Sequence, residues 1–154
     1  LHLCDRRQLQ MFIRDRYWNS EAKGALTGIT RTTRKAEMVR AGVECIAYQI
    51  ADVVNAMSQD ANTEIQELRV DGGPTRNQYL MQFQSDILNR KVLVPDAEEL
   101  SGIGAAYAAG RGLGLYGDEV FTRLKRREYA PKMCEDTRVR KYNGWKDAVG
   151  HVLK

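Results

Sequence analysis

The chain has 154 residues, a length that fits one domain able to bury a hydrophobic core. Hydrophobic residues make up 43% of it and charged residues 29%, as in an ordinary soluble globular protein. A net charge of +4 permits contact with anions but is too small to indicate nucleic-acid binding by itself. The apolar runs fall short of a membrane span, so we expect no membrane partner.

The three cysteines and two histidines of the chain indicate no metal centre. Cys4, Cys45 and Cys134 stand far apart and form no Cys-x-x-Cys pair. An odd number of cysteines at such spacing fits neither a disulfide framework nor a zinc site. His2 and His151 have no metal-ligand spacing either. We therefore expect a cytoplasmic protein in a reducing environment.

The first half of the chain predicts a strand followed by a long helix. Residues 22–30 carry small residues at alternate positions and are expected to form the strand. Thr32 or Thr33 then caps a helix over about 35–58, because apolar residues recur there at spacings of three and four. Gly42 lies on that apolar stripe, which indicates a close approach of another backbone.

Strands and helices alternate along the second half. A strand at 68–70 precedes a helix over about 74–89, and the apolar run 91–94 is typical of a buried strand. A helix rich in glycine and alanine begins at about residue 97, and residues 137–154 form a last amphipathic helix. This order predicts an α/β domain with a mostly parallel sheet flanked by helices.

The turn Asp71-Gly72-Gly73 is the candidate binding site. Two glycines between a strand and a helix let backbone N–H groups approach a ligand, because no Cβ stands in the way. A helix N-terminus at Pro74 would add the positive end of its dipole and so favour an anion such as a phosphate. The same residues also suit an ordinary strand-to-helix turn. The residues alone indicate no nucleophile and no general base.

Two other features are weaker candidates. The glycine repeat at 110–114 looks like part of a dinucleotide fingerprint, but it follows a helix rather than a strand. Arg123, Lys125, Arg126 and Arg127 could contact nucleic-acid phosphates. No aromatic platform or recognition helix accompanies this basic cluster, so a solvated surface is favoured and no nucleic-acid partner is expected.

Three stretches of the chain form a joint pattern. They are residues 17–18 with 24–31 and 44–49, then the Val-Asp-Gly-Gly turn at 70–73 with Asn77 and 80–88, and then the small-residue helix at 99–110. Together they resemble the C-terminal domain of the FGGY carbohydrate kinases, most closely the glycerol kinase branch. Residues 129–133 and 142–146 are similar to the closing segment of that family. The resemblance covers 17–154 and leaves 1–16 as an atypical head.

The resemblance implies the ribonuclease-H-like, actin-type ATPase fold. In that family two such domains close on ATP and a polyol, with Mg²⁺ accompanying ATP as co-substrate, and the γ-phosphoryl group passes to a hydroxyl. By motif position, Gly73 corresponds to the glycine whose backbone meets the nucleotide phosphates and Asn77 to a residue near the nucleoside. Asp71 and Gly72 shape the same turn. Backbone donors suit phosphoryl transfer, which depends on positioning and electrostatic stabilisation.

The resemblance also implies parts that these residues do not supply. By the resemblance, we expect the family's polyol-binding N-terminal domain and its catalytic aspartate to precede the counterpart of Leu1. We therefore expect these residues to be the nucleotide-binding C-terminal part of an ATP-dependent polyol or sugar kinase. The parent kinase would be glycerol kinase-like and convert glycerol to glycerol 3-phosphate. These residues alone are expected to be inactive. An alternative is a non-catalytic nucleotide-binding or oligomerisation module derived from such a kinase. An unpaired sheet edge near the head at 1–16 would favour a homo-oligomer.

Overall fold

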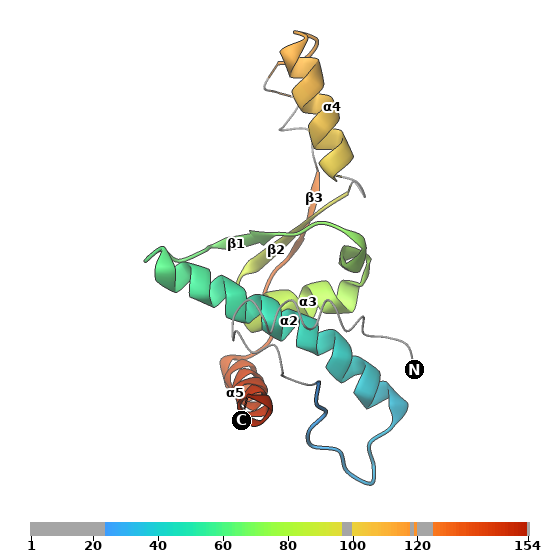
Figure 1. The fold of residues 1–154 in the computed structure, drawn as a ribbon, viewed down its shortest axis with the longest axis vertical. Helices are drawn as coiled ribbons and strands as arrows, with labels where there is room; N and C mark the ends of the chain where they lie inside the picture. The colour runs from blue at the N-terminus through green and yellow to red at the C-terminus, as the bar shows by residue number, and fades with distance from the viewer. Residues whose placement is uncertain (1–23, 97–99, 118, 120–124, 154) are drawn as a thin grey trace. The chain divides into compact units, whose positions relative to one another are not determined.

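The computed structural model describes residues 24–96, 100–117, 119 and 125–153 (Figure 1). The described chain divides into two compact units. One unit combines the described residues up to Glu64 with those from Lys132 onward. The other unit runs from Ile65 to Pro131. The described elements of the first unit are two helices, whereas the second unit contains the three described strands and further helices. The candidate turn belongs to the second unit.

The first unit contains the long helix α2 (Lys35–Asp60), which confirms the helix predicted over 35–58. Its cap differs from the prediction. The helix begins after Arg34, whose backbone N–H donates to Glu37 Oε2 at 2.9 Å. Thr33 instead closes the preceding turn, where its Oγ1 accepts from the backbone N–H of Thr30 at 2.9 Å. The acidic residue in the first turn, rather than a threonine, therefore satisfies the free N–H at the start of α2.

Helix α5 (Glu135–Val152) packs on α2 through polar and aromatic contacts. The ring of Trp145 stacks on that of Tyr48 with centroids 5.5 Å apart. Asp52 is buried and accepts hydrogen bonds from Trp145 Nε1, at 2.8 Å, and from the hydroxyl of Tyr142. The prediction of a closing helix is confirmed, with a start two residues earlier than Thr137.

Two expectations for the first unit are wrong. Residues 24–30 form no strand, because Gly28 has φ +75° and none of the described strands pairs with this segment. Residues 22 and 23 of the expected strand lie outside the described part. Among the described residues, none provides the expected close backbone approach at Gly42, since a Cβ built there meets none of their atoms within 4 Å.

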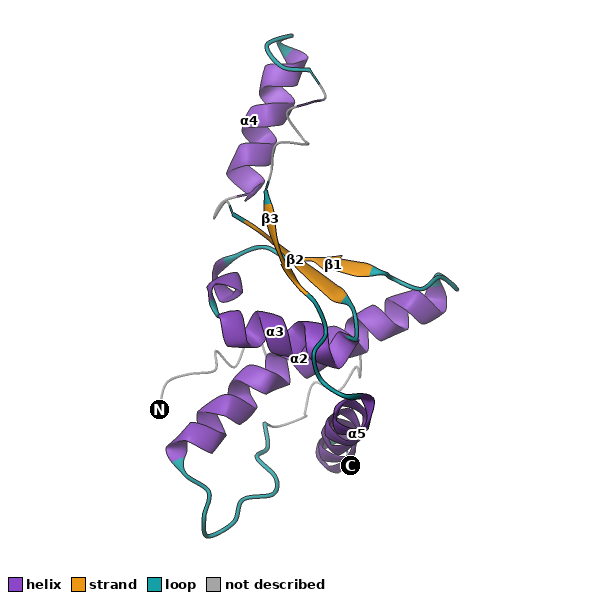
Figure 2. Cartoon of the chain, turned by 180° about the vertical axis from the view of Figure 1, so that it is seen from behind, coloured by secondary structure: helices purple, strands orange, loops and turns teal. Residues whose placement is uncertain are grey.

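The second unit contains a sheet of three strands in the order β1-β2-β3 (Figure 2). β1 (Glu67–Arg69) and β2 (Lys91–Pro95) are parallel, with Leu68 opposite Val92, and β3 (Arg126–Tyr129) is antiparallel to β2. The described sheet is therefore mixed, which corrects the prediction of a mostly parallel one. β3 escaped prediction because it is an edge strand of charged residues without apolar alternation.

Helix α3 (Gln78–Leu88) packs on β2 and β3, and the short 3₁₀ helix η1 (Gly73–Arg76) precedes it. Phe83 and Ile87 of α3 are buried, as is Val92 of β2. The continuous helix predicted over 74–89 is thus two helices. Asn77 separates them because its backbone is extended, with φ −81° and ψ 97°.

Helix α4 (Leu100–Gly112) follows β2 and confirms the predicted glycine- and alanine-rich helix. Its expected beginning at residue 97 lies outside the described part. The expected loop at 112–117 follows it without regular structure beyond Gly112. The described elements together form an α/β domain, which confirms the predicted class.

Candidate functional site

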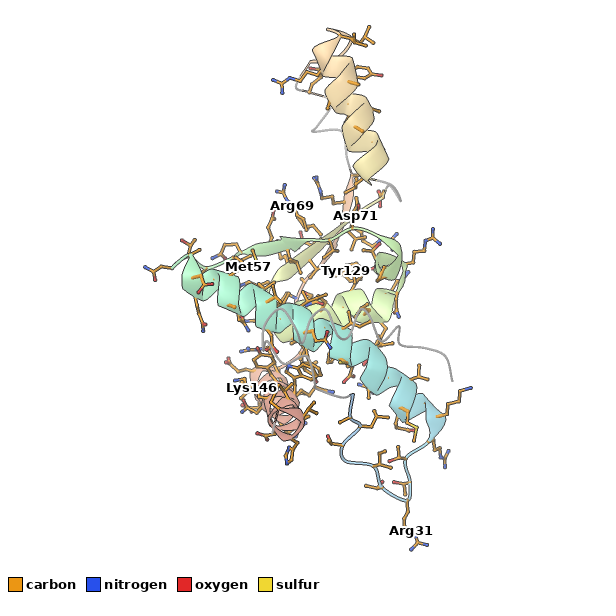
Figure 3. The ribbon with its side chains drawn as sticks, in the orientation of Figure 1. Arg31, Met57, Arg69, Asp71, Tyr129 and Lys146 are labelled. Atoms are coloured by element: carbon orange, nitrogen blue, oxygen red, sulfur yellow. The ribbon has the colours of Figure 1, made fainter. Side chains whose placement is uncertain are left out.

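The candidate turn leaves the carboxyl end of β1, where Figure 3 marks Arg69 and Asp71. Val70 extends the pairing of the parallel strands, since its N–H donates to Leu93 O at 3.1 Å. Asp71, Gly72 and Gly73 then follow as an exposed segment. In open α/β sheets, ligands bind outside the carboxyl ends of parallel strands. The turn therefore lies at the end of the sheet where a ligand is expected.

Gly72 uses both of its backbone groups within the turn. Its φ of +96° is a conformation that residues with a side chain rarely adopt. Its N–H donates to Asp71 Oδ1 at 2.7 Å. Its carbonyl oxygen accepts from both the backbone N–H and the hydroxyl of Thr75, at 3.1 and 2.7 Å. Gly72 therefore shapes the turn but has no N–H left for a ligand.

Gly73 presents its N–H differently. It is the first residue of η1, and its N–H donates to none of the described residues. A Cβ built on Gly73 meets nothing within 4 Å, so the space beside its backbone is open. The sequence predicted that both glycines would offer amides to an anion. The structure separates them, with Gly73 as the available donor and Gly72 as the residue that shapes the turn.

Asn77 is the N-cap of α3. Its Oδ1 accepts from the backbone N–H of Leu80 at 3.1 Å, and this satisfies one of the free donors of the first turn of α3. The side-chain nitrogen of Asn77 bonds to none of the described residues. Asn77 can therefore hold the helix start with one end of its amide and offer the other end to a ligand.

The helix dipole contributes less to this site than the sequence indicated. The helix that begins at Gly73 is a single 3₁₀ turn of four residues, whereas α3 begins at Gln78 behind its Asn77 cap. A dipole of useful size needs several aligned turns. The attraction for an anion at the turn therefore rests on the amide of Gly73 rather than on a long helix.

Thr75 is a residue of the turn that the sequence analysis did not single out. It is half-buried, and it is the only described side chain that bonds to the carbonyl of Gly72. A threonine three residues after a turn glycine is the available sequence signal, because Ser and Thr hydroxyls commonly bond to nearby backbone groups. That signal does not reveal which carbonyl the hydroxyl will bind.

Other described features lie away from the turn. A shallow depression of about 330 Å³ borders the amino ends of β1 and β2, opposite the end that carries the turn. It is lined by Gln66, Glu67, Asn89, Arg90, Lys91 and Pro131. Within the described ranges, no three His, Cys, Asp or Glu side chains gather as metal ligands. None of the described helices is long and apolar enough to cross a membrane.

The basic cluster is only partly described. Lys125, Arg126 and Arg127 are exposed, the last two on edge strand β3. Arg123 lies outside the described residues. An edge strand with charged side chains is protected against pairing with other strands, which gives these arginines a structural reason.

Comparison with known proteins places this fold and turn in a family. The sequence pattern of the FGGY family of carbohydrate kinases, C-terminal domain, matches residues 10–113. The chain belongs to this family of carbohydrate kinases.

Within this family, the chain is similar to glycerol kinases. The chain is 46% identical over 136 residues to a glycerol kinase of Staphylococcus epidermidis, covering 86% of this chain and 27% of that protein. It is 47% identical over 136 residues to a glycerol kinase of Brachyspira hyodysenteriae, covering 86% of this chain and 28% of that protein. The chain thus spans little more than a quarter of the length of these relatives.

Solved structures agree with the sequence comparison. The glycerol kinase of Plasmodium falciparum, crystallised with ADP, has a TM-score of 0.81 and 32% identity, covering 90% of this chain and 28% of that one. A xylulose kinase of Rhodospirillum rubrum has a TM-score of 0.70 and 26% identity, covering 85% of this chain and 28% of that one. The described α/β fold is therefore that of FGGY kinase C-terminal domains.

Proposed function

We propose that this chain is the nucleotide-binding C-terminal part of an ATP-dependent polyol kinase of the glycerol kinase type. Its fold would be of the ribonuclease-H-like, actin-type ATPase class. The available amide of Gly73 at the carboxyl end of β1 is the observation that carries the proposal. The 46% identity to a glycerol kinase supports the choice of branch. The similar structure crystallised with ADP supports the choice of ligand.

The geometry of the turn fits a nucleotide phosphate. The backbone N–H of Gly73 would donate to a phosphate oxygen, and the exposure of Gly73, together with the absence of a Cβ, would allow that oxygen to approach the backbone. The side-chain nitrogen of Asn77 would contact the nucleoside. Asp71 would remain bonded to Gly72 N–H, so that its carboxylate stabilises the turn.

Mg²⁺ fits this arrangement as a companion of the nucleotide. The described residues gather no set of three metal-ligating side chains, so the ion would be held chiefly by phosphate oxygens. When bound, it would neutralise part of the phosphate charge. The residues of this chain would contribute position and hydrogen bonds, which are the main protein contributions to phosphoryl transfer.

The 154 residues alone are expected to bind nucleotide without phosphorylating glycerol. The matched part of this chain covers only 27% of the glycerol kinase of Staphylococcus epidermidis. A coupled assay for ATP-dependent formation of glycerol 3-phosphate by this chain tests that expectation. Turnover above the background of a heat-inactivated sample would contradict it.

Calorimetric titration with MgADP tests the nucleotide site. The variants Gly73→Ala and Gly73→Val add a Cβ that meets none of the described atoms within 4 Å, so they should leave the fold intact and obstruct the phosphate. Gly144→Ala on α5 is a matched control, because its added methyl group also meets nothing within 4 Å.

We expect MgADP affinity to fall at least tenfold in Gly73→Val, less in Gly73→Ala and not at all in Gly144→Ala. A tenfold loss corresponds to about 1.4 kcal/mol of binding free energy, roughly the value of one good hydrogen bond to a charged group. Equal affinities in all four proteins would show that Gly73 does not contact the nucleotide. No binding to the unmodified chain would refute the proposed function.

A further inference from the structure

Thr75 makes two hydrogen bonds to a single carbonyl. Its backbone N–H and its hydroxyl both donate to Gly72 O, at 3.1 and 2.7 Å. The first bond is the ordinary closure of a turn, and any residue other than proline could make it. The second bond needs a hydroxyl at this position. The side chain of Thr75 therefore adds a restraint that the backbone alone does not supply.

That restraint acts on the amide of Gly73. The carbonyl of Gly72 and the N–H of Gly73 belong to the same planar peptide group. In a trans peptide these two groups point in opposite directions. Fixing the carbonyl oxygen toward Thr75 therefore directs the Gly73 N–H away from Thr75, and Gly73 itself is exposed.

A glycine pair needs such a restraint more than other residues do. Neither Gly72 nor Gly73 has a Cβ to limit its backbone torsions, so their shared peptide group can rotate at little steric cost. The rotated peptide would present the carbonyl oxygen of Gly72 to an incoming phosphate in place of an N–H. The Gly72 N–H could not compensate, because Asp71 Oδ1 already accepts it at 2.7 Å.

We propose that Thr75 is a positioning residue, whose hydroxyl holds the Gly72–Gly73 peptide so that the Gly73 N–H faces a nucleotide phosphate. The inference rests on the proposed nucleotide-binding function of the turn. It adds a residue that would not touch the nucleotide and acts through the peptide group. Its signature is a loss of affinity that depends on the phosphates of the ligand.

The test compares Thr75→Val, which removes the hydroxyl at nearly the same size, with Thr75→Ser, which keeps it. Calorimetry measures the affinity of each protein for MgADP and for adenosine, which has no phosphate. We expect Thr75→Val to bind MgADP three- to tenfold more weakly and adenosine as the unmodified chain does. Thr75→Ser should bind MgADP within twofold of the unmodified chain. Thr75→Ala replaces Thr75→Val if the valine variant does not fold.

The outcomes separate this inference from the function on which it rests. Unchanged MgADP affinity in Thr75→Val would overturn the role of Thr75 alone. An equal loss for MgADP and adenosine, or a loss in Thr75→Ser as large as in Thr75→Val, would also overturn it, since either indicates general damage to the turn. No MgADP binding by the unmodified chain would overturn the proposed function together with this inference.

Discussion

Replacing Asp52 with alanine should destabilise the packing of α5 on α2 more than any change on the exposed side of α2. Asp52 is 3% exposed, and its two carboxylate oxygens accept from different residues of α5. Trp145 donates through Nε1 at 2.8 Å, and Tyr142 donates through its hydroxyl. One side chain thus connects two consecutive turns of α5 to α2.

The loss of stability in Asp52→Ala depends on the two donors, from Trp145 and Tyr142, that would lose their carboxylate acceptor. A hydrogen bond to a charged group contributes roughly 1.5–3 kcal/mol when the site is buried. Trp145 and Tyr142 are only half-buried, so water replaces part of each bond. We therefore expect Asp52→Ala to lower the free energy of unfolding by about 2–3 kcal/mol. Trp145→Phe keeps the ring but loses the donor, and should cost about 1–1.5 kcal/mol.

Urea denaturation followed by far-ultraviolet circular dichroism measures these changes. Gln59→Ala is the matched control, because Gln59 is exposed in the last turn of the same helix and should change stability by less than about 0.5 kcal/mol. The double variant Asp52→Ala/Trp145→Phe should lose less than the sum of the two single losses, because both remove the same bond. Strict additivity, or an Asp52→Ala variant as stable as Gln59→Ala, would refute this account.

Three further outcomes are expected. Gly42→Ala should raise the free energy of unfolding by about 1 kcal/mol in the same urea assay, because alanine favours the helix and its methyl group meets none of the described atoms within 4 Å. A lower free energy of unfolding would contradict this expectation. Ser85→Ala should lower it by about 1–3 kcal/mol, because the fully buried hydroxyl lies within 2.9 Å of Tyr129 O, and an unchanged midpoint would contradict the bond. The side chain and backbone N–H of Thr137 lower the pKa of the exposed Cys134 thiol. At pH values below the ordinary thiol pKa, the unmodified chain should therefore have more Cys134 thiolate than Thr137→Val. Site-resolved mass spectrometry should find that Cys134 is alkylated more slowly in Thr137→Val. Equal rates would contradict the effect of Thr137 on the thiol pKa.

Strong periodic patterns predicted the elements that pack by apolar faces. The helix over 35–58, the apolar run at 91–94 and the closing helix all exist within a few residues of their predicted bounds. Burial of apolar residues determines α2 and β2, and that pattern is visible in the sequence. The closing helix α5 has no buried residue and packs through aromatic and polar contacts instead. The strand expected at 22–30 had only alternating small residues, which do not require a pleated surface. The positive φ of Gly28 is incompatible with that strand.

Elements determined by hydrogen bonds were predicted less well. β3 pairs along β2 through its backbone, so its charged side chains give no strand signal. The division of the helix at 74–89 depends on Asn77, which caps α3 from an extended backbone. Asparagine at a helix start is a recognised cap, but proline and glycine upstream gave an equally good start signal.

In the candidate turn too, the features determined by hydrogen bonds were the ones that the sequence predicted less well. The sequence predicted Asp71, Gly72 and Gly73 as a phosphate-binding turn, and all three residues follow β1 in the structure. The family resemblance assigned the phosphate contact to Gly73. The glycine pair alone could not show which N–H is available, because that depends on the bond that the Gly72 N–H donates to Asp71. The sequence also could not show that the Thr75 hydroxyl bonds to the carbonyl of Gly72, because that requires the direction of one carbonyl.

The most direct test of the central claim observes the amide of Gly73 itself. A ¹⁵N–¹H correlation spectrum of the full chain, titrated with MgADP and separately with adenosine, reports each backbone N–H individually. We predict a large downfield shift of the Gly73 amide proton with MgADP, a small shift with adenosine and little change at Gly72, whose N–H already has an acceptor. A Gly73 resonance that does not respond to MgADP, while other residues of the chain do, would contradict the claim that this amide binds the nucleotide phosphate.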